Sequence, residues 1–265
     1  MNAAAPAFDS ELYKSLNSSR EEILRSLFSQ IKEPLQLRTA LDVGCGMGHF
    51  SAFLHSLGFY VTAVDGRAEN AAEAKRRYPE ISFVTANAED LPLAQLPPSD
   101  LVLCFGLLYH LENPFRTIRH LHALTGKLLI IESMCAPGPD SSMELLDEYH
   151  AEDQGLNFVA FYPTESCLVK MLYRAGFPVV YGFVTPPDHM DFRATKRRKK
   201  ARCMLAAAKG PLRVPSLFPI SEPARQWDIW SAPTSPWRFR LARFATFLRR
   251  SRSETSPANQ AARKT

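Results

Sequence analysis

The sequence predicts an α/β fold built around a parallel β-sheet. Short apolar segments alternate along the chain with helical segments of about 10 to 15 residues, which is the pattern of right-handed β–α–β crossovers. A sheet of this kind is covered by helices on both faces. The 265 residues, 46% apolar and 22% charged, suffice for one large domain with an appendage. The composition excludes disorder throughout, and the absence of long apolar runs excludes transmembrane helices.

The individual elements follow from local signals. Apolar runs predict strands at residues 39–43, 60–64, 81–85, 101–105 and 127–132, and periodic patterns predict helices at 49–57, 68–78 and 114–124. Before them, residues 8–31 have the spacing of one or two amphipathic helices, and Pro34 follows as a stop. After them we expect a short helix at 143–149, a helix at 164–175, and strands at 179–184 and 202–208. Thr164 opens the longer helix and Gly176 closes it.

Charge divides the chain into two parts. Residues 1–189 hold 14 basic and 23 acidic side chains, whereas residues 190–265 hold 18 and 4. From Gly210 prolines are frequent, so we expect an extended excursion over the surface, and a disordered end. Residues 237–250 read as a basic amphipathic helix. Such a tail indicates contact with an anionic membrane surface, docking onto the acidic body, or contact with nucleic acid.

The cysteines and the N-terminus indicate a compartment. The five cysteines lie 31 or more residues apart, so no CxxC pair suggests a zinc or redox site, and we expect no metal. The first residues lack the pattern of a secretory signal. We therefore expect a reduced cytoplasmic chain, with peripheral membrane contact as an alternative location.

A glycine-rich turn is the most informative segment. Gly44, Gly46 and Gly48 follow the first strand and precede a helix, which leaves room for a ligand against the backbone. A dinucleotide fingerprint would need glycine at position 49, where His49 stands. The carboxylate of Asp42 beside the turn opposes a pyrophosphate and suits a ligand that carries an ammonium and a sulfonium.

A second acid completes a predicted nucleoside site. Asp65 ends the second strand, 21 residues after Gly44, where a carboxylate can accept hydrogen bonds from both ribose hydroxyls. Together the glycine turn and this acid predict a site for a cationic nucleoside.

These residues resemble the class I S-adenosylmethionine-dependent methyltransferases, closely over residues 38–134 and loosely to about 208. The resemblance implies S-adenosyl-L-methionine as the cofactor. It also implies a Rossmann-like seven-stranded sheet of order 3-2-1-4-5-7-6, with strand 7 antiparallel and the last two strands as hairpin partners at the edge. The cofactor-binding positions that we carry over or predict are Asp42, Gly44, Cys45, Gly46, Gly48, Asp65, Gly66, Asn87, Ala88, Phe105 and His110. Among them the resemblance assigns Asn87 and Ala88 to adenine and the backbone near Phe105 to the methionine part.

The predicted organisation has three parts. Residues 1–35 form an N-terminal helical cap, residues 36–209 the cofactor-binding domain, and residues 210–265 a proline-rich basic extension that contains the helix at 237–250.

The exit of the fourth strand bears on the acceptor. It lacks the Pro-Pro motif usual in methyltransferases that act on base or glutamine nitrogens, and Cys104 within it is flanked by apolar residues and reads as a buried strand cysteine. An oxygen acceptor on a small molecule, a glycan or a lipid-linked molecule fits best. The candidate catalytic residues are His110, Glu132 and His150, with His110 as the base closest to the methyl position. The aromatic residues Phe158, Phe161 and Tyr162 line the acceptor pocket or pack in the core.

Two alternatives stay open. The segment YHLENP is also similar to wobble-uridine tRNA methyl- and carboxymethyltransferases, although that group would carry a substantial basic N-terminal domain where this chain has about 35 residues. A catalytically idle module that binds the same cofactor is the second alternative.

Overall fold

The computed structural model describes residues 11–90, 96–148, 155–156, 159–195 and 199–224. The chain divides into two compact units, and the first, which ends at Pro223, contains all the described helices and strands. Of the second unit only Ala224 is described, so the predicted helix at 237–250 and the predicted disordered end lie outside the described residues.

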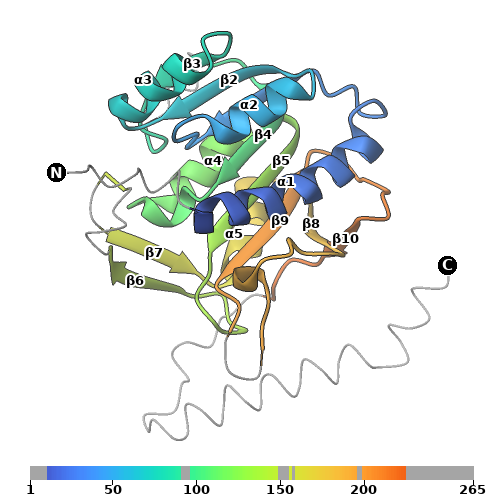
Figure 1. Cartoon of the computed structure of the whole chain (residues 1–265). Coiled ribbons are helices and arrows are strands. Elements are labelled where there is room, and N and C mark those ends of the chain that lie inside the picture. Colours follow the sequence, from blue (N-terminus) through green and yellow to red (C-terminus); the bar gives the residue numbers. More distant parts are fainter. Residues whose placement is uncertain (1–10, 91–95, 149–154, 157–158, 196–198, 225–265) are drawn as a thin grey trace, which may run out of the picture. The chain divides into compact units, whose positions relative to one another are not determined.

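An eight-stranded sheet forms the centre of the first unit, in the order β10-β8-β9-β5-β4-β1-β2-β3 (Figure 1). The strands from β3 to β5 in this order are parallel, and β9 runs antiparallel between β5 and β8. Their bounds are β1 (Thr39–Val43), β2 (Tyr60–Asp65), β3 (Ser82–Thr85), β4 (Ser99–Phe105), β5 (Thr125–Met134), β8 (Val179–Phe183), β9 (Arg202–Ala208) and β10 (Leu217–Ile220). The predicted Rossmann-like α/β fold is confirmed.

The predicted number of strands is wrong by one, because part of the proline-rich segment joins the sheet. β10 pairs antiparallel with β8, so β8 is not the edge strand. Pro219 is tolerated there because a strand with one neighbour leaves half of its N–H positions unpaired. The ring of Phe218 lies on Gly182, where an added Cβ would come within 2.4 Å of it.

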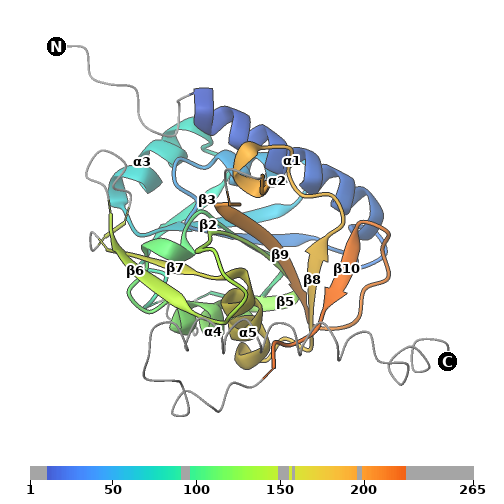
Figure 2. The ribbon, with the colours of Figure 1, turned by 90° about the horizontal axis from the view of Figure 1, so that it is seen from below.

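Helices cover the two faces of the sheet (Figure 2). α1 (Glu11–Ile31) and α2 (His49–Ser56) pack on one face, and α4 (Pro114–Leu124) and α5 (Glu165–Ala175) pack on the other. The central strands supply both cores by alternation, with Leu103 on the α1 side and Val102 on the α4 side. The remaining helices are α3 (Ala68–Arg77) and the short 3₁₀ turns η2 (Leu108–His110) and η3 (Met190–Phe192). None of the described helices is long and apolar enough to cross a membrane.

The helix that we predict at residues 143–149 is wrong. The segment instead forms β6 (Met143–Asp147), which pairs antiparallel with β7 (Val159–Pro163) in a separate two-stranded sheet. Its backbone hydrogen bonds go to a partner well separated in sequence, which local spacing cannot reveal.

The N-terminal segment belongs to the same hydrophobic core as the sheet. A single helix, α1, occupies residues 11–31, and Leu24, Leu27 and Ile31 are buried among sheet residues. The division into residues 1–35, 36–209 and 210–265 stays a prediction.

Candidate functional site

The glycine turn lies where β1 meets α2, at the carboxyl edge of the parallel strands. Gly44, Gly46 and Gly48 have φ values of 78°, 53° and 85°, a conformation that L side chains rarely adopt. A Cβ at Gly44 would stand 2.7 Å from Cβ of Leu107, so only glycine fits beside the exit of β4. Gly48 is the N-cap of α2. The three glycines let the backbone turn tightly, with Gly44 half-buried and Gly46 and Gly48 buried.

Asp65 connects this turn to the end of β2. Its Oδ2 accepts the N–H of Gly46 at 2.8 Å, and its Oδ1 accepts the N–H of Arg67 at 2.9 Å and the side-chain amide of Asn70 at 3.1 Å. The residue is only 8% exposed. Its carboxylate is thereby oriented at the mouth of a cavity, with acceptor capacity left for a ligand hydroxyl.

Two cavities flank Gly44. The first is lined by six of the predicted residues, namely Gly44, Asp65, Gly66, Asn87, Ala88 and His110. The second is lined by five of them, namely Asp42, Gly44, Cys45, Gly46 and Phe105. Because both cavities share the glycine turn, one elongated ligand can occupy both by bending around it.

The side chain of Asn87 closes a turn after β3. Its Oδ1 accepts the N–H of Glu89 at 3.0 Å, and its Nδ2 donates to Asp90 at 3.2 Å. The side chain thus uses its hydrogen-bonding groups locally, and the segment it shapes, with Ala88, lines the first cavity.

Asp42 lies below the glycine turn and is 2% exposed. The hydroxyl of Ser51 donates to its Oδ2 at 2.6 Å. Burial, and to a smaller extent the negative charge of Asp65, raises the pKa of Asp42 to about 7, against the lowering effect of Ser51. A cation arriving in the second cavity would favour its ionised form.

His110 stands at the end of η2 and closes the first cavity. Its Nδ1 lies against Oε1 of Glu148, and its ring packs on Tyr109 with centroids 4.2 Å apart. Oε2 of Glu148 also accepts the N–H of Gly155 at 3.2 Å, and Arg67 donates to the carbonyl of Gly155 at 2.6 Å. His110 is therefore paired with a carboxylate beside the predicted ribose position.

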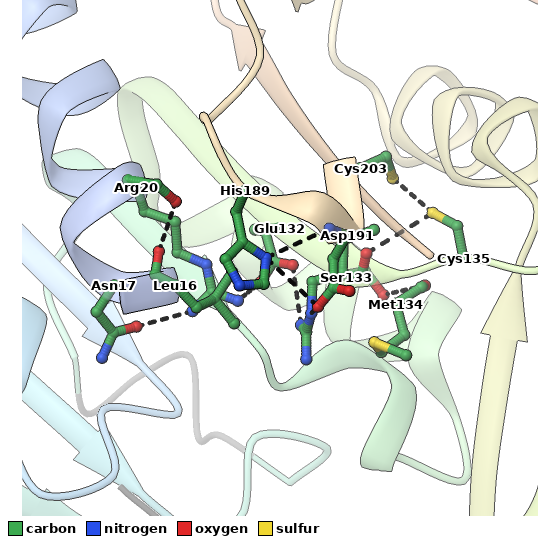
Figure 3. A network of polar contacts seen from close by, with 12 residues as sticks. Leu16, Asn17, Arg20, Glu132, Ser133, Met134, Cys135, His189, Asp191 and Cys203 are labelled. Carbon is green, nitrogen blue, oxygen red and sulfur yellow. Dashed lines mark hydrogen bonds and ion pairs between the residues drawn. The ribbon is translucent and has the colours of Figure 1, made fainter. Parts of the chain in front are cut away.

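Glu132, a predicted catalytic residue, is fully buried, and Figure 3 shows it beside Arg20. Arg20 from α1 donates to its Oε2 at 2.7 Å, and Arg202 from β9 donates to its Oε1 at 3.0 Å. Burial alone would raise the pKa of Glu132, but the two guanidinium groups outweigh it and hold that pKa below its usual range. An enclosed carboxylate held ionised in this way is a weak proton acceptor, and it fastens α1 to the sheet.

The other predicted residues are distributed as follows. His150 and Phe158 lie outside the described residues. Phe161 lines a surface groove beside α4, whereas Tyr162 packs edge-on against Tyr109 with centroids 5.6 Å apart. Cys104 is completely buried in β4, which confirms the prediction of a strand cysteine.

Sequence reasoning missed several residues that the fold brings to the second cavity. Tyr13, Asn17 and Arg20 of α1 line it, and the guanidinium of Arg20 lies 5.9 Å from the centroid of Phe105. Above Gly106, the hydroxyls of Tyr13 and Tyr109 converge within 4 Å of where a Cβ would be. One signal was available: Asn17 and Arg20 are polar residues on the otherwise apolar face of α1.

Comparison with known proteins identifies the class to which this site belongs. A family model described as a methyltransferase domain matches residues 41–127, which span β1 to the start of β5. Over this segment the chain is similar to S-adenosylmethionine-dependent methyltransferases, and the comparisons support that class for the site.

Named relatives fall into different groups. A tRNA U34 carboxymethyltransferase of Tolumonas auensis is 27% identical over 156 residues, which cover 54% of this chain and 45% of the relative. A ubiquinone biosynthesis O-methyltransferase of a Caulobacter strain is 33% identical over 109 residues, covering 39% and 43%. The chain thus spans less than half the length of these curated relatives.

Solved structures share the fold. The N-terminal domain of EvdMO1 with SAH bound superposes with a TM-score of 0.59 at 20% identity, covering 75% of this chain and 84% of that one. The magnesium protoporphyrin IX methyltransferase of Synechocystis with bound SAM gives a TM-score of 0.52 at 19% identity, covering 79% and 87%. At these identities the likeness concerns the fold.

The buried ion triad predicts a structural role for Glu132. Glu132→Gln removes the charge shared by Arg20 and Arg202, so we expect the free energy of unfolding to fall by about 3–5 kcal/mol. Urea denaturation followed by circular dichroism measures this. The control Glu33→Gln removes a carboxylate from the exposed ion pair with Arg38 and should change stability little. Unchanged stability together with lost turnover would instead return Glu132 to the catalytic residues.

Proposed function

We propose that the chain binds S-adenosyl-L-methionine across the two cavities that flank Gly44 and methylates an oxygen of a small-molecule, glycan or lipid-linked acceptor. The observation that supports it best is the hydrogen bond from the Gly46 N–H to Asp65, which holds a carboxylate against a glycine turn with a cavity on each side. The family match supports the cofactor, and the bound SAH and SAM of the structural neighbours agree with it.

The first cavity suits the adenosine part. Asp65 would accept hydrogen bonds from the ribose hydroxyls. The backbone of Asn87 and Ala88 would meet the edge of adenine, with Leu107 and Leu111 as apolar neighbours of the base. Gly66 and Leu156, which lie close to each other, also line this cavity.

The second cavity suits the amino acid part, which carries an ammonium and a carboxylate. Asp42 is the acid available to the ammonium. Arg20 is the cation available to the carboxylate, and its Nε is buried with no hydrogen-bond partner among the described residues. The cavity thus offers an acid to the ammonium and a guanidinium to the carboxylate.

When bound, the cofactor supplies a methyl group on a sulfonium, open to in-line displacement by a nucleophile. The chain's own contribution is to hold and desolvate the reacting groups. Tyr13 and Tyr109 wall the space above Gly106, next to Phe105. His110 would take the proton of an acceptor hydroxyl, and Glu148 would stabilise the resulting imidazolium.

A tRNA acceptor is the second candidate function. It is favoured by the curated relatives that match over 54% of this chain and are named tRNA U34 carboxymethyltransferases. The relatives named ubiquinone biosynthesis O-methyltransferases favour the oxygen acceptor of a small molecule.

Turnover tests the proposal. The purified chain is incubated with the cofactor and, separately, with phenolic small molecules, glycans, lipid-linked glycans and tRNA transcripts. One of these acceptor classes should lead to release of S-adenosylhomocysteine. His110→Ala should lower kcat by about 10²- to 10⁴-fold with little change in the cofactor Kd, because it removes the base. His122→Ala, on the half-buried side chain at the end of α4, is the matched control. Tight cofactor binding with no release over all acceptors would favour the idle binding module.

Asp65→Ala should weaken cofactor binding. Two charge-assisted hydrogen bonds of about 1.5–3 kcal/mol each would be lost, which corresponds to a rise in Kd of at least about 100-fold. Isothermal titration calorimetry measures it, with a melting curve to verify folding. Glu69→Gln, at an exposed acid in the first turn of α3, is the control. An unchanged Kd for Asp65→Ala contradicts the placement of the ribose.

Affinity should depend on pH through Asp42. Its pKa of about 7 in the free protein exceeds the ordinary value of 3.8, so the acid is mostly protonated below pH 7 and must lose its proton to pair with an ammonium. The cofactor Kd should therefore rise as the pH falls from 8 to 6, approaching about tenfold per unit below the pKa. Calorimetry at pH 6.5 in buffers of different ionisation enthalpy should detect proton release. Asp42→Asn should flatten the profile, and a profile unaffected by this change would refute the assignment.

For the basic C-terminal segment we propose contact with an anionic membrane surface, with docking onto the acidic body as the alternative. Residues 237–250 lie outside the described residues, so their sequence pattern alone supports peripheral membrane contact. Flotation with anionic and with neutral vesicles, for the full chain and a chain ending at residue 236, tests it. We expect the full chain to cofractionate with anionic vesicles but not with neutral ones. The shortened chain should cofractionate with neither. No cofractionation would end the proposal in favour of docking onto the acidic body.

A further inference from the structure

Two cysteines that lie far apart in the sequence meet in the fold. Cys135 follows the last residue of β5, and Cys203 is the second residue of β9. The two strands are antiparallel neighbours, with Ser133 opposite Cys203, and the N–H of Cys135 donates to the carbonyl of Ala201 at 2.7 Å. The two Sγ atoms stand 2.7 Å apart (Figure 3).

This separation is close to bonding distance. A disulfide has an S–S bond of about 2.05 Å, so the sulfurs need to approach by only about 0.7 Å, a shift that small changes of two side-chain angles can supply. Both residues are buried, at 6% and 2% exposure, and neither is used by the proposed chemistry. Cys45, Cys104 and Cys167 lie in the glycine turn, β4 and α5, and the described residues contain no second pair of sulfurs in contact.

We propose that Cys135 and Cys203 form a redox-responsive disulfide that clamps the start of β9 to the end of β5. With oxidised glutathione as the oxidant, the two protein thiols give up two protons and two electrons as the S–S bond forms. The disulfide of glutathione breaks, takes up the two electrons, and leaves as two molecules of reduced glutathione that carry the protons.

The position of the pair connects its redox state to the site. Arg202 lies between Ala201 and Cys203, and its side chain reaches Glu132 at 3.0 Å and lies 5.7 Å from the centroid of the Tyr109 ring. A covalent link from Cys203 to Cys135 restrains the backbone on which Arg202 stands. The oxidised form therefore holds the arginine, Glu132 and Tyr109 in the arrangement described above.

The surroundings set how the pair reacts. The hydrogen bond with Cys135 and burial raise the pKa of Cys203, which slows attack on an external disulfide. Lys200 lowers the pKa of Cys203, but Lys200 is paired with Glu165 at 2.6 Å, and the carboxylate of Glu165 has the larger, opposite effect on that pKa. Exchange with a small oxidant is therefore slow, and because both cysteines are buried the bond, once formed, is shielded from reductants.

Mass spectrometry of the full-length protein tests the proposal. Protein reduced, desalted and then equilibrated with oxidised glutathione should lose two hydrogen atoms from its intact mass, and peptide mapping should show Cys135 linked to Cys203. The melting temperature should rise by roughly 5–15 °C, because the link closes a long loop. Cys167→Ser, at the half-buried cysteine of α5, should behave like the unaltered chain. Cys203→Ser should show neither the link nor the rise.

The opposite results are equally specific. The proposal is overturned if both cysteines remain free thiols in the folded, oxidised sample and become linked only after denaturation. It is also overturned if glutathione adducts or links to other cysteines are the only products. These readouts come from the unaltered chain, so a serine variant that fails to fold leaves them valid.

Discussion

The hydrogen bond between the Gly46 N–H and Asp65 organises the candidate site. In a parallel sheet the carboxyl ends of neighbouring strands meet at one edge, but the loops beyond them are free to diverge. Here the carboxylate of Asp65, at the end of β2, accepts hydrogen bonds from the loop after β1 and from the start of α3. This connection joins the glycine turn, which both cavities share, to the Asp65 carboxylate that lines the first of them.

The ion triad of Arg20, Glu132 and Arg202 performs the complementary task on the other side of β4. It joins α1, β5 and β9 at a point where water is excluded, so the loss of any member leaves a buried charge without its partner. The triad places α1 against the second cavity. The N-terminal helix is thereby part of the wall around the predicted methyl position, through Tyr13 and Arg20.

The parallel half of the fold and the glycine site could be predicted because their signals are local. Within a short stretch of chain the sequence indicates a strand end at Val43, a tight turn at Gly44 and an acid at Asp65. These residues lie together because the carboxyl ends of neighbouring parallel strands meet at one edge of the sheet. The two partners of Glu132 stand 112 and 70 residues away, and the partner of Cys135 stands 68 away. Contacts of this kind depend on the completed tertiary structure and leave no periodicity in the sequence.

The same reasoning explains the errors at β6 and β10. The pattern of residues 143–149 is compatible with a helix, and only pairing with β7 makes it a strand. Leu217–Ile220 contains a proline that argues against a central strand, yet a margin of the sheet accepts it. Asn17 and Arg20 show the remaining limit, since their burial was readable from helical spacing but their partners were not.

The proline in β10 has a consequence for the behaviour of the molecule in a crowded solution. An open sheet ends in strands whose unused N–H and C=O groups invite a strand from another molecule. Pro219 interrupts that row of donors at one margin, and at the other margin β3 has only four residues. Both borders of the sheet are thus poor templates for intermolecular strand addition, which protects the chain from aggregating through its edges.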